Sequence, residues 1–288
     1  MKFAITLFAG NPEHWPAIVQ RADALGFHSV WLADHLITPM QWSSEYPYRE
    51  GGPGYGPDAP IMDTWVTIGH LAGVTKRIML GSGVFVLPMR NPIATARAVA
   101  TAQYFSKGRI LFGIGTGWLA EEFEAVGEDF KTRGKRTDEI VEILTRLWSG
   151  EEVSHSGTFY RFNPVKFSPK PSPHIPLIFG GTTDAALRRT ALHGDGWFAP
   201  SRPLDEIMAA IRKLEGLRRN AGRDKLPFQT WVRCYSDPTI ENIKQHEAEG
   251  VRNLTVPIVL GETLQQKLDA LEKFAHDVMP KFPLARKK

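Results

Sequence analysis

Short apolar runs alternate with longer amphipathic segments along most of the chain. The apolar runs predict strands and the amphipathic segments predict helices. The predicted strands cover residues 3–8, 29–33, 78–86, 110–114, 176–179, 196–199, 228–235 and 253–259. The predicted helices cover residues 12–25, 63–74, 92–105, a long region that ends with 139–148, and then 185–193, 204–219, 240–249 and 263–278.

This repeated order of strand and then helix predicts a parallel sheet. Eight such units in 288 residues fit a closed (β/α)8 TIM barrel, with residues 1–288 as a single domain. An open doubly wound sheet is the alternative, and it normally carries a glycine-rich turn after its first strand. Here the first strand leads into Ala9-Gly10-Asn11-Pro12, which has no G-x-G-x-x-G pattern.

Two segments interrupt the alternation. Residues Met40–Pro60, after the second strand, are rich in Gly, Pro, Tyr and Trp, and a loop of this length in a compact domain is typical of a lid or a binding loop. Residues Glu152–Phe167 predict a β-hairpin that turns near Ser156-Gly157. We therefore expect a barrel with a hairpin insertion and a long loop after strand two.

Composition and charge are those of an ordinary globular protein, with 42% hydrophobic and 23% charged residues and a net charge of +4. The one dense basic cluster, Arg286-Lys287-Lys288, predicts a solvated terminus, and we expect no nucleic-acid partner. The single cysteine, Cys234, excludes a disulfide within the chain and predicts a buried thiol. No secretory signal or membrane span is visible, so we expect a soluble cytoplasmic protein.

Candidate chemistry is sought at the carboxyl ends of the strands, because all of them open onto one face of a barrel. Asp34 and His35 follow the second strand, and the imidazole is a candidate general acid or base. The alternative is that the pair only fixes a loop. Gly81-Ser82-Gly83-Val84, within the third strand, indicates a bulge or a close approach to the backbone.

Three further segments follow later strands. The alternating glycines of Gly113–Trp118 would let a ligand touch main chain, with Thr116 offering a hydroxyl and Trp118 a wall. Gly180-Gly181-Thr182-Thr183-Asp184 opens a helix, which favours a phosphate site at the free amides, although an ordinary capped loop has the same pattern. Arg202 would meet an anion or lie in solvent.

No motif for a metal centre or for a serine or cysteine nucleophile is present in the sequence. A bound organic cofactor would then supply the chemistry.

With these segments the sequence resembles the luciferase-like monooxygenase superfamily, and most closely its branch that uses the deazaflavin coenzyme F420. The matching stretches run through most of the chain in family order: LADH (32–35), GSGV (81–84), FGIGTGWLAEEFEAVG (112–127), RGKRTDEIVEILTRLWSGEEVSHSGTFYRF (133–162) and IFGGTTDAALRRTALHGDGWF (178–198).

The resemblance implies the barrel and a cis peptide bond between Gly83 and Val84 that backs the cofactor ring. It implies that Asp34 and His35 lie beside the ring, with His35 as the proton donor. It also implies a cofactor-binding set made of Asp34, His35, Gly83, Val84, Thr116, Gly117, Trp118, Gly180, Gly181 and Thr182, of which the last three hold the phosphate. Some dehydrogenase relatives have Glu where this chain has Trp118, which argues against a sugar-phosphate substrate.

The leading hypothesis is an enzyme that transfers hydride between F420 and a small organic substrate, with Trp42 and Arg202 as substrate contacts. The alternatives are a two-component FMN-dependent monooxygenase, a non-catalytic flavin-binding barrel and a cofactor-free barrel isomerase that binds a phosphorylated metabolite. Relatives are often dimers, so a homodimer is expected.

Overall fold

The computed structural model describes residues 1–8, 10–48, 52–259 and 261–284, so the predicted tail at Arg286–Lys288 and part of the 40–60 loop lie outside it. Within these residues, eight parallel strands form a ring that closes through pairing of β3 with β5, which rules out the open sheet. In ring order they are β3 (Met79–Ser82), β2 (Ser29–Leu32), β1 (Lys2–Leu7), β11 (Asn253–Thr255), β10 (Gln229–Arg233), β9 (Gly196–Phe198), β8 (Leu177–Gly180) and β5 (Ile110–Gly115).

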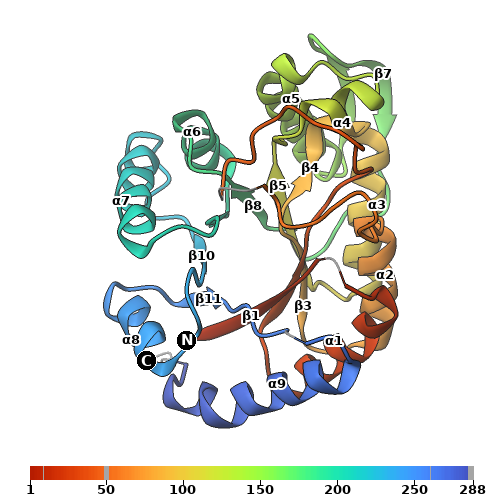
Figure 1. The fold of residues 1–288 in the computed structure, drawn as a ribbon. Coiled ribbons are helices and arrows are strands. Elements are labelled where there is room, and N and C mark those ends of the chain that lie inside the picture. Colours follow the sequence, from red (N-terminus) through yellow and green to blue (C-terminus); the bar gives the residue numbers. More distant parts are fainter. Residues whose placement is uncertain (9, 49–51, 260, 285–288) are drawn as a thin grey trace.

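Helices surround the strands, as Figure 1 shows. They are α1 (Trp15–Leu25), α2 (Thr64–Val74), α3 (Pro92–Phe105), α4 (Ala120–Ala125), α5 (Arg133–Leu147), α6 (Asp184–His193), α7 (Leu204–Asn220), α8 (Ile240–Ala248) and α9 (Leu264–Asp277). The predicted cap Asp63 accepts hydrogen bonds from two amides at the start of α2. Asn11 caps a short 3-10 turn, Pro12–His14, that leads into α1.

Two predicted elements are divided. The third strand, predicted as 78–86, is β3 followed by β4 (Phe85–Val86), and the cis peptide bond expected from the resemblance lies between them at Gly83-Val84. Both parts pair with β5, so the chain bulges and then rejoins the same neighbour. The long helical region is α4, a 3-10 turn (Phe130–Thr132) and α5, because Gly127 adopts a positive φ of 78° just after α4.

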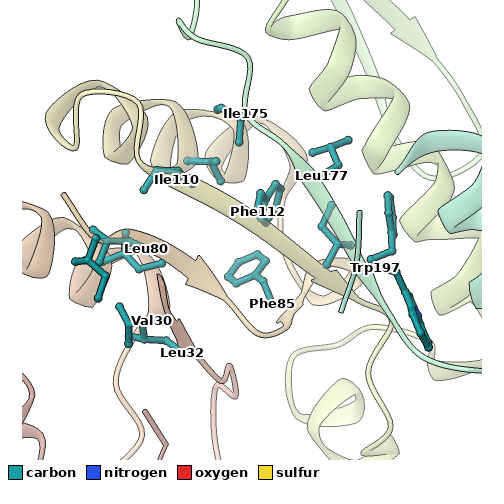
Figure 2. Packing of buried hydrophobic residues seen from close by; sticks show 14 of the residues in the cluster. Val30, Leu32, Leu80, Phe85, Ile110, Phe112, Ile175, Leu177 and Trp197 are labelled. Carbon is teal, nitrogen blue, oxygen red and sulfur yellow. The ribbon is translucent and has the colours of Figure 1, made fainter. Parts of the chain in front are cut away.

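Two layers of apolar side chains hold the barrel together. The outer layer lies between strands and helices, where Phe85, Phe112 and Leu177 pack side by side (Figure 2). The inner layer fills the barrel itself with Ala4, Trp31, Leu111, Ile178, Phe198 and Trp231. Because these side chains fill the interior, a ligand bound within the barrel would lie above them, at the mouth formed by the carboxyl ends of the strands.

The hairpin is confirmed as β6 (Glu152–Ser156) paired antiparallel with β7 (Arg161–Lys166), with a turn slightly later than predicted. It lies outside the barrel against α5, whose Glu139 carboxylate accepts the turn amides of Thr158, Phe159 and Tyr160. The Cys234 thiol is buried as expected, and burial raises its pKa to about 11.

Candidate active site at the barrel mouth

Asp34 follows β2 and is almost completely buried at the rim of the mouth. Its carboxylate accepts hydrogen bonds from the Val86 amide at 2.8 Å, the Thr64 hydroxyl at 2.8 Å and Arg90 Nη2 at 3.0 Å. Burial raises its pKa, and the Arg90 charge and these hydrogen bonds oppose that rise. Asp34 therefore ties the end of β2 to β4, directly beyond the Gly83-Val84 bulge.

His35 is the next residue, and both of its ring nitrogens have partners. Nδ1 lies 2.9 Å from Glu122 Oε2, and Nε2 lies 2.8 Å from the hydroxyl of Tyr55. The other oxygen of Glu122 accepts the Leu36 amide at 2.5 Å. Since a carboxylate accepts from the Nδ1 proton, the lone pair of Nε2 faces Tyr55. This order of bonds prepares Nε2 to exchange a proton with a ligand oxygen.

Sequence reasoning did not single out Glu122, although it lies within one of the matching stretches. It is 1% exposed, on the inner side of α4. The signal for it was the helical spacing of Leu119, Glu122 and Phe123, which share one buried face. A carboxylate in such a face needs a partner, and here that partner is His35. Trp118 is not an acid, but the carboxylate of Glu122 reaches the histidine.

The floor of the mouth is the bulge, and Gly83 and Val84 are both partly exposed there. Gly115 and Gly180 lie beside this bulge. Contact between a ligand and their main chain was predicted, but the structure gives a different reason for glycine at these positions. A Cβ built on Gly115 would lie 2.4 Å from Val84 Cγ2, and one on Gly180 would lie 3.0 Å from Val84 Cγ1. These glycines make room for Val84 itself. Gly117 has a φ of 81° and lies against Phe123, so its Cβ space is also filled by protein.

The predicted phosphate segment lies on the far side of the bulge. Gly181 has a φ of 97°, which favours glycine, and Thr183 caps α6 by accepting the Ala186 amide. A cavity of about 330 Å³ adjoins this helix start, and its lining includes Thr182, Arg202 and Lys213. Glu206 also lines the cavity, and Lys213 pairs with Asp184 at 2.5 Å, so Arg202 and the amides at the start of α6 are the groups that suit an anionic ligand.

The 40–60 loop lies against the mouth through aromatic rings. Tyr46 packs edge-on against Trp118 at 5.0 Å between ring centroids, and Tyr55 packs against Phe8 at 4.8 Å. Arg202 donates to the backbone oxygen of Pro47, which ties the loop to the phosphate side. Trp42 is partly buried in the same loop.

Glu121 fastens the start of this loop. Its carboxylate accepts hydrogen bonds from the backbone amide and hydroxyl groups of Ser43 and Ser44, at 2.6–3.2 Å. Burial alone would raise the pKa of Glu121, but these bonds lower it to about 2. Burial raises the pKa of Tyr48, and it also raises the pKa of Tyr55. Both phenols therefore stay protonated at neutral pH.

The described residues hold no cluster of three or more potential metal ligands. Among the same residues, no helix combines the length and the apolar character needed to cross a membrane.

Comparison with known proteins identifies the family of this chain. The family model for luciferase-like monooxygenases matches residues 1–277. An uncharacterized protein of Mycobacterium tuberculosis is 33% identical over 272 residues, which are 92% of this chain and 94% of that protein. The F420-dependent hydroxymycolic acid dehydrogenase of the same organism is 27% identical over 212 residues, 72% of this chain and 54% of that protein.

The fold also has a close counterpart among solved structures. An F420-dependent secondary alcohol dehydrogenase in complex with an F420-acetone adduct superposes with a TM-score of 0.80 at 19% identity, covering 97% of this chain and 98% of that one. At this identity the likeness establishes the TIM-barrel fold alone. The family match over residues 1–277 and the 33% identical relative show that the chain belongs to the luciferase-like monooxygenase family, whose members are oxidoreductases that use F420 or FMN.

Proposed function

We propose that this protein is an F420-dependent oxidoreductase that transfers hydride between the deazaflavin and a small organic substrate bound in the barrel mouth. One observation carries the proposal: the Gly83-Val84 bulge, the His35–Glu122 pair and the cavity beside Thr182 all open at the same end of the barrel. The F420-dependent dehydrogenase among its relatives supports this cofactor over FMN.

The residues present fit a tricyclic ring with a phosphate tail. The partly exposed backbone of Gly83 and Val84 offers a flat surface between β3 and β4, and a side chain at Gly83 would meet Trp31 at 3.0 Å. The segment Gly180–Thr182, with Arg202, would hold the phosphate through amides and positive charge. When bound, the deazaflavin supplies a carbon that gives or accepts hydride.

His35 would manage the proton that accompanies hydride transfer at a substrate oxygen. Glu122 holds Nδ1, so Nε2 is the atom that takes or returns this proton. In the structure the Tyr55 hydroxyl lies at Nε2, and a substrate hydroxyl or carbonyl would take that place. The rings of Tyr46, Tyr55 and Trp118 would exclude water from the reacting atoms.

The cofactor is tested by parallel fluorescence titrations of the purified protein with F420 and with FMN. We expect saturable F420 binding and much weaker FMN binding. A preference for reduced FMN, with product formation that requires oxygen, would instead indicate a two-component monooxygenase. Binding of neither cofactor would overturn the proposal.

Catalysis is tested separately in the His35→Gln variant. General acid–base groups typically contribute about 100- to 10,000-fold to turnover. We therefore expect turnover with F420 to fall by at least about 100-fold while F420 binding stays near the wild-type value. Wild-type turnover in this variant would remove His35 from the mechanism, and no turnover in the wild-type protein across alcohols, carbonyls and unsaturated carbonyls would favour a cofactor-binding role without catalysis.

A further inference from the structure

Arg233, the last residue of β10, lies within the mouth and has no role in the function proposed above. The inner layer of the barrel contains Trp231, which is fully buried. Because side chains alternate along a strand, Arg233 points to the same inner side, one layer closer to the mouth. Its Nη2 donates to the Thr6 hydroxyl at 3.3 Å. Thr6 follows the inward-facing Ala4 by two residues on β1, just as Arg233 follows Trp231 on β10. The guanidinium group is thus inside the barrel mouth.

The guanidinium group lacks an acidic partner among the described residues. Thr6 is its one side-chain hydrogen-bond partner there, and no carboxylate of that part of the chain lies within ion-pair distance. Burial lowers the pKa of Arg233, but a guanidinium group remains charged at neutral pH. A partly buried charge of this kind is costly unless an anion compensates it.

Three other arginines that are largely withdrawn from water are compensated. Arg90 pairs with Asp34 at 3.0 Å, and Arg189 pairs with Asp138 at 2.5 Å. Arg109 donates to four backbone oxygens and the Thr75 hydroxyl. Arg233 differs from all of them, and it differs at the point where a substrate would enter.

The position of Arg233 around the ring separates it from the cofactor contacts. From β3 to β10 the ring runs β3-β2-β1-β11-β10 in one direction and β3-β5-β8-β9-β10 in the other, four steps each way. β10 is therefore diametrically opposite the Gly83-Val84 bulge. A molecule between the bulge-bound ring and Arg233 would also have His35 of the β2 end beside it. Phe8, which directly follows β1 and packs against Tyr55, provides an apolar wall.

We propose that Arg233 is the residue that selects the substrate, by binding a carboxylate on a molecule whose body is apolar or aromatic. The planar guanidinium group matches a carboxylate in two parallel hydrogen bonds. Anchored in this way, the substrate would extend from Arg233 across the mouth toward the bulge. The reaction of this substrate rests on the proposed function, whereas its binding to Arg233 does not.

The test measures binding of a carboxylate and of its neutral isostere to the cofactor-free protein. Benzoate and benzamide are titrated by isothermal calorimetry against the wild type and the variants Arg233→Gln and Arg233→Lys. We expect the wild type to bind benzoate at least about tenfold more tightly than benzamide, since charge-assisted hydrogen bonds are the stronger class. Arg233→Gln should abolish this preference, and Arg233→Lys should keep part of it.

Arg212→Gln is the matched control, because this arginine is exposed on α7, and it should leave the benzoate preference unchanged. Arg202→Gln examines the cavity beside Thr182, and it should weaken binding of inorganic phosphate. Equal binding of benzoate and benzamide by the wild type overturns the proposal, and so does an unchanged preference in Arg233→Gln. Loss of the preference in Arg202→Gln alone would mean that benzoate binds at the phosphate site, and it would also overturn the proposal. A failed F420 titration together with an intact, Arg233-dependent preference would reject the proposed function and retain this site.

Discussion

Nδ1 of His35 lies 2.9 Å from Oε2 of Glu122, although 87 residues separate them in the sequence. The two side chains are largely withdrawn from water, at 10% and 2% exposure. Glu122 also accepts the Leu36 amide, so one carboxylate fixes both the imidazole and the backbone that carries it. We interpret Glu122 as a positioning residue that sets which nitrogen of His35 bears the proton.

Replacing Glu122 with Gln should therefore disturb His35 without removing it. An amide has one oxygen where the carboxylate has two, so it does not serve both Nδ1 and the Leu36 amide equally well. We expect turnover to fall by about 10- to 1,000-fold, within the range of general acid–base contributions. Nitrogen-15 NMR of His35 should show a change from a predominant Nδ1-H tautomer to a mixture.

The Glu124→Gln variant is the control, since Glu124 is exposed on the same helix. It should leave turnover and the His35 spectrum unchanged. If Glu122→Gln lowered turnover but preserved the tautomer, Glu122 would be a structural residue only.

Glu121 should hold the 40–60 loop closed. The Glu121→Ala variant removes the acceptor for the amides and hydroxyls of Ser43 and Ser44. We expect several-fold faster chymotrypsin cleavage in the loop at pH 7, because its Trp42, Tyr46, Tyr48 and Tyr55 are cleavage sites once the loop opens. Glu124→Ala should be cleaved at the wild-type rate, and equal rates in both variants would show that Glu121 does not anchor the loop.

The same residue gives a pH dependence of stability with a definite sign. The pKa of Glu121 is about 2 in the folded protein, below its ordinary value of 4.5. A lowered folded pKa stabilises the folded state above pH 4.5, and this contribution is lost as the pH falls from 4.5 toward 2. In urea unfolding, the wild type should exceed Glu121→Ala in stability at pH 7, and the difference should shrink across that window. A difference that stayed constant down to pH 2 would contradict this assignment.

The barrel could be predicted from the sequence because the same unit, a strand followed by a helix, is repeated eight times. Each apolar run followed by an amphipathic segment forms one local unit, and small errors at its ends do not alter the order. The break between β3 and β4 was harder to place, since residues 78–86 are all apolar or small and no charged residue or proline interrupts them. The glycines and the family resemblance, together, located the bulge.

Only some residues of the candidate site could be predicted from the sequence. His35 and the Gly180–Thr182 segment directly follow strands, so topology alone brings them to the mouth. Glu122 and Tyr55 reach His35 from a helix and a loop, and their contacts depend on tertiary packing that no local pattern encodes. The alternating glycines of residues 113–117 were predicted for a ligand, yet Gly115 lies against Val84 of the protein itself.

This contact between Gly115 and Val84 leads to a stability prediction. Gly115→Ala would place a methyl group 2.4 Å from Val84 Cγ2, below the distance of any real contact. Because overpacking of this kind typically costs about 1–3 kcal/mol, the free energy of unfolding in urea should fall by that amount. Adding Val84→Ala should restore part of the loss by vacating the same space.

Gly69→Ala serves as the reference substitution. Gly69 is exposed in the middle of α2, and a Cβ there would have nothing within 4 Å. Alanine should stabilise this helix by about 0.5–1 kcal/mol. Gly115→Ala that proved as stable as the wild type would mean that the bulge adapts, and that Val84 does not require the glycine.

Asp34 is the residue whose loss should be most damaging. In Asp34→Ala the Arg90 guanidinium, 13% exposed, would lose its acidic partner, and the Val86 amide and Thr64 hydroxyl would lose their acceptor. Breaking a buried ion pair from one side typically costs about 3–5 kcal/mol, because an uncompensated charge is left behind. Urea unfolding should show a loss of this size.

The double variant Asp34→Ala/Arg90→Met separates the charge from the hydrogen bonds. Removing both charges eliminates the unpaired guanidinium group but still leaves the Val86 amide without its carboxylate. The double variant should thus be more stable than Asp34→Ala alone and less stable than the wild type. F420 affinity should remain reduced in it, because the Val86 hydrogen bond, rather than the ion pair, connects Asp34 to the strand that follows the Gly83-Val84 bulge. Full recovery of both stability and affinity would show that Asp34 serves only to neutralise Arg90.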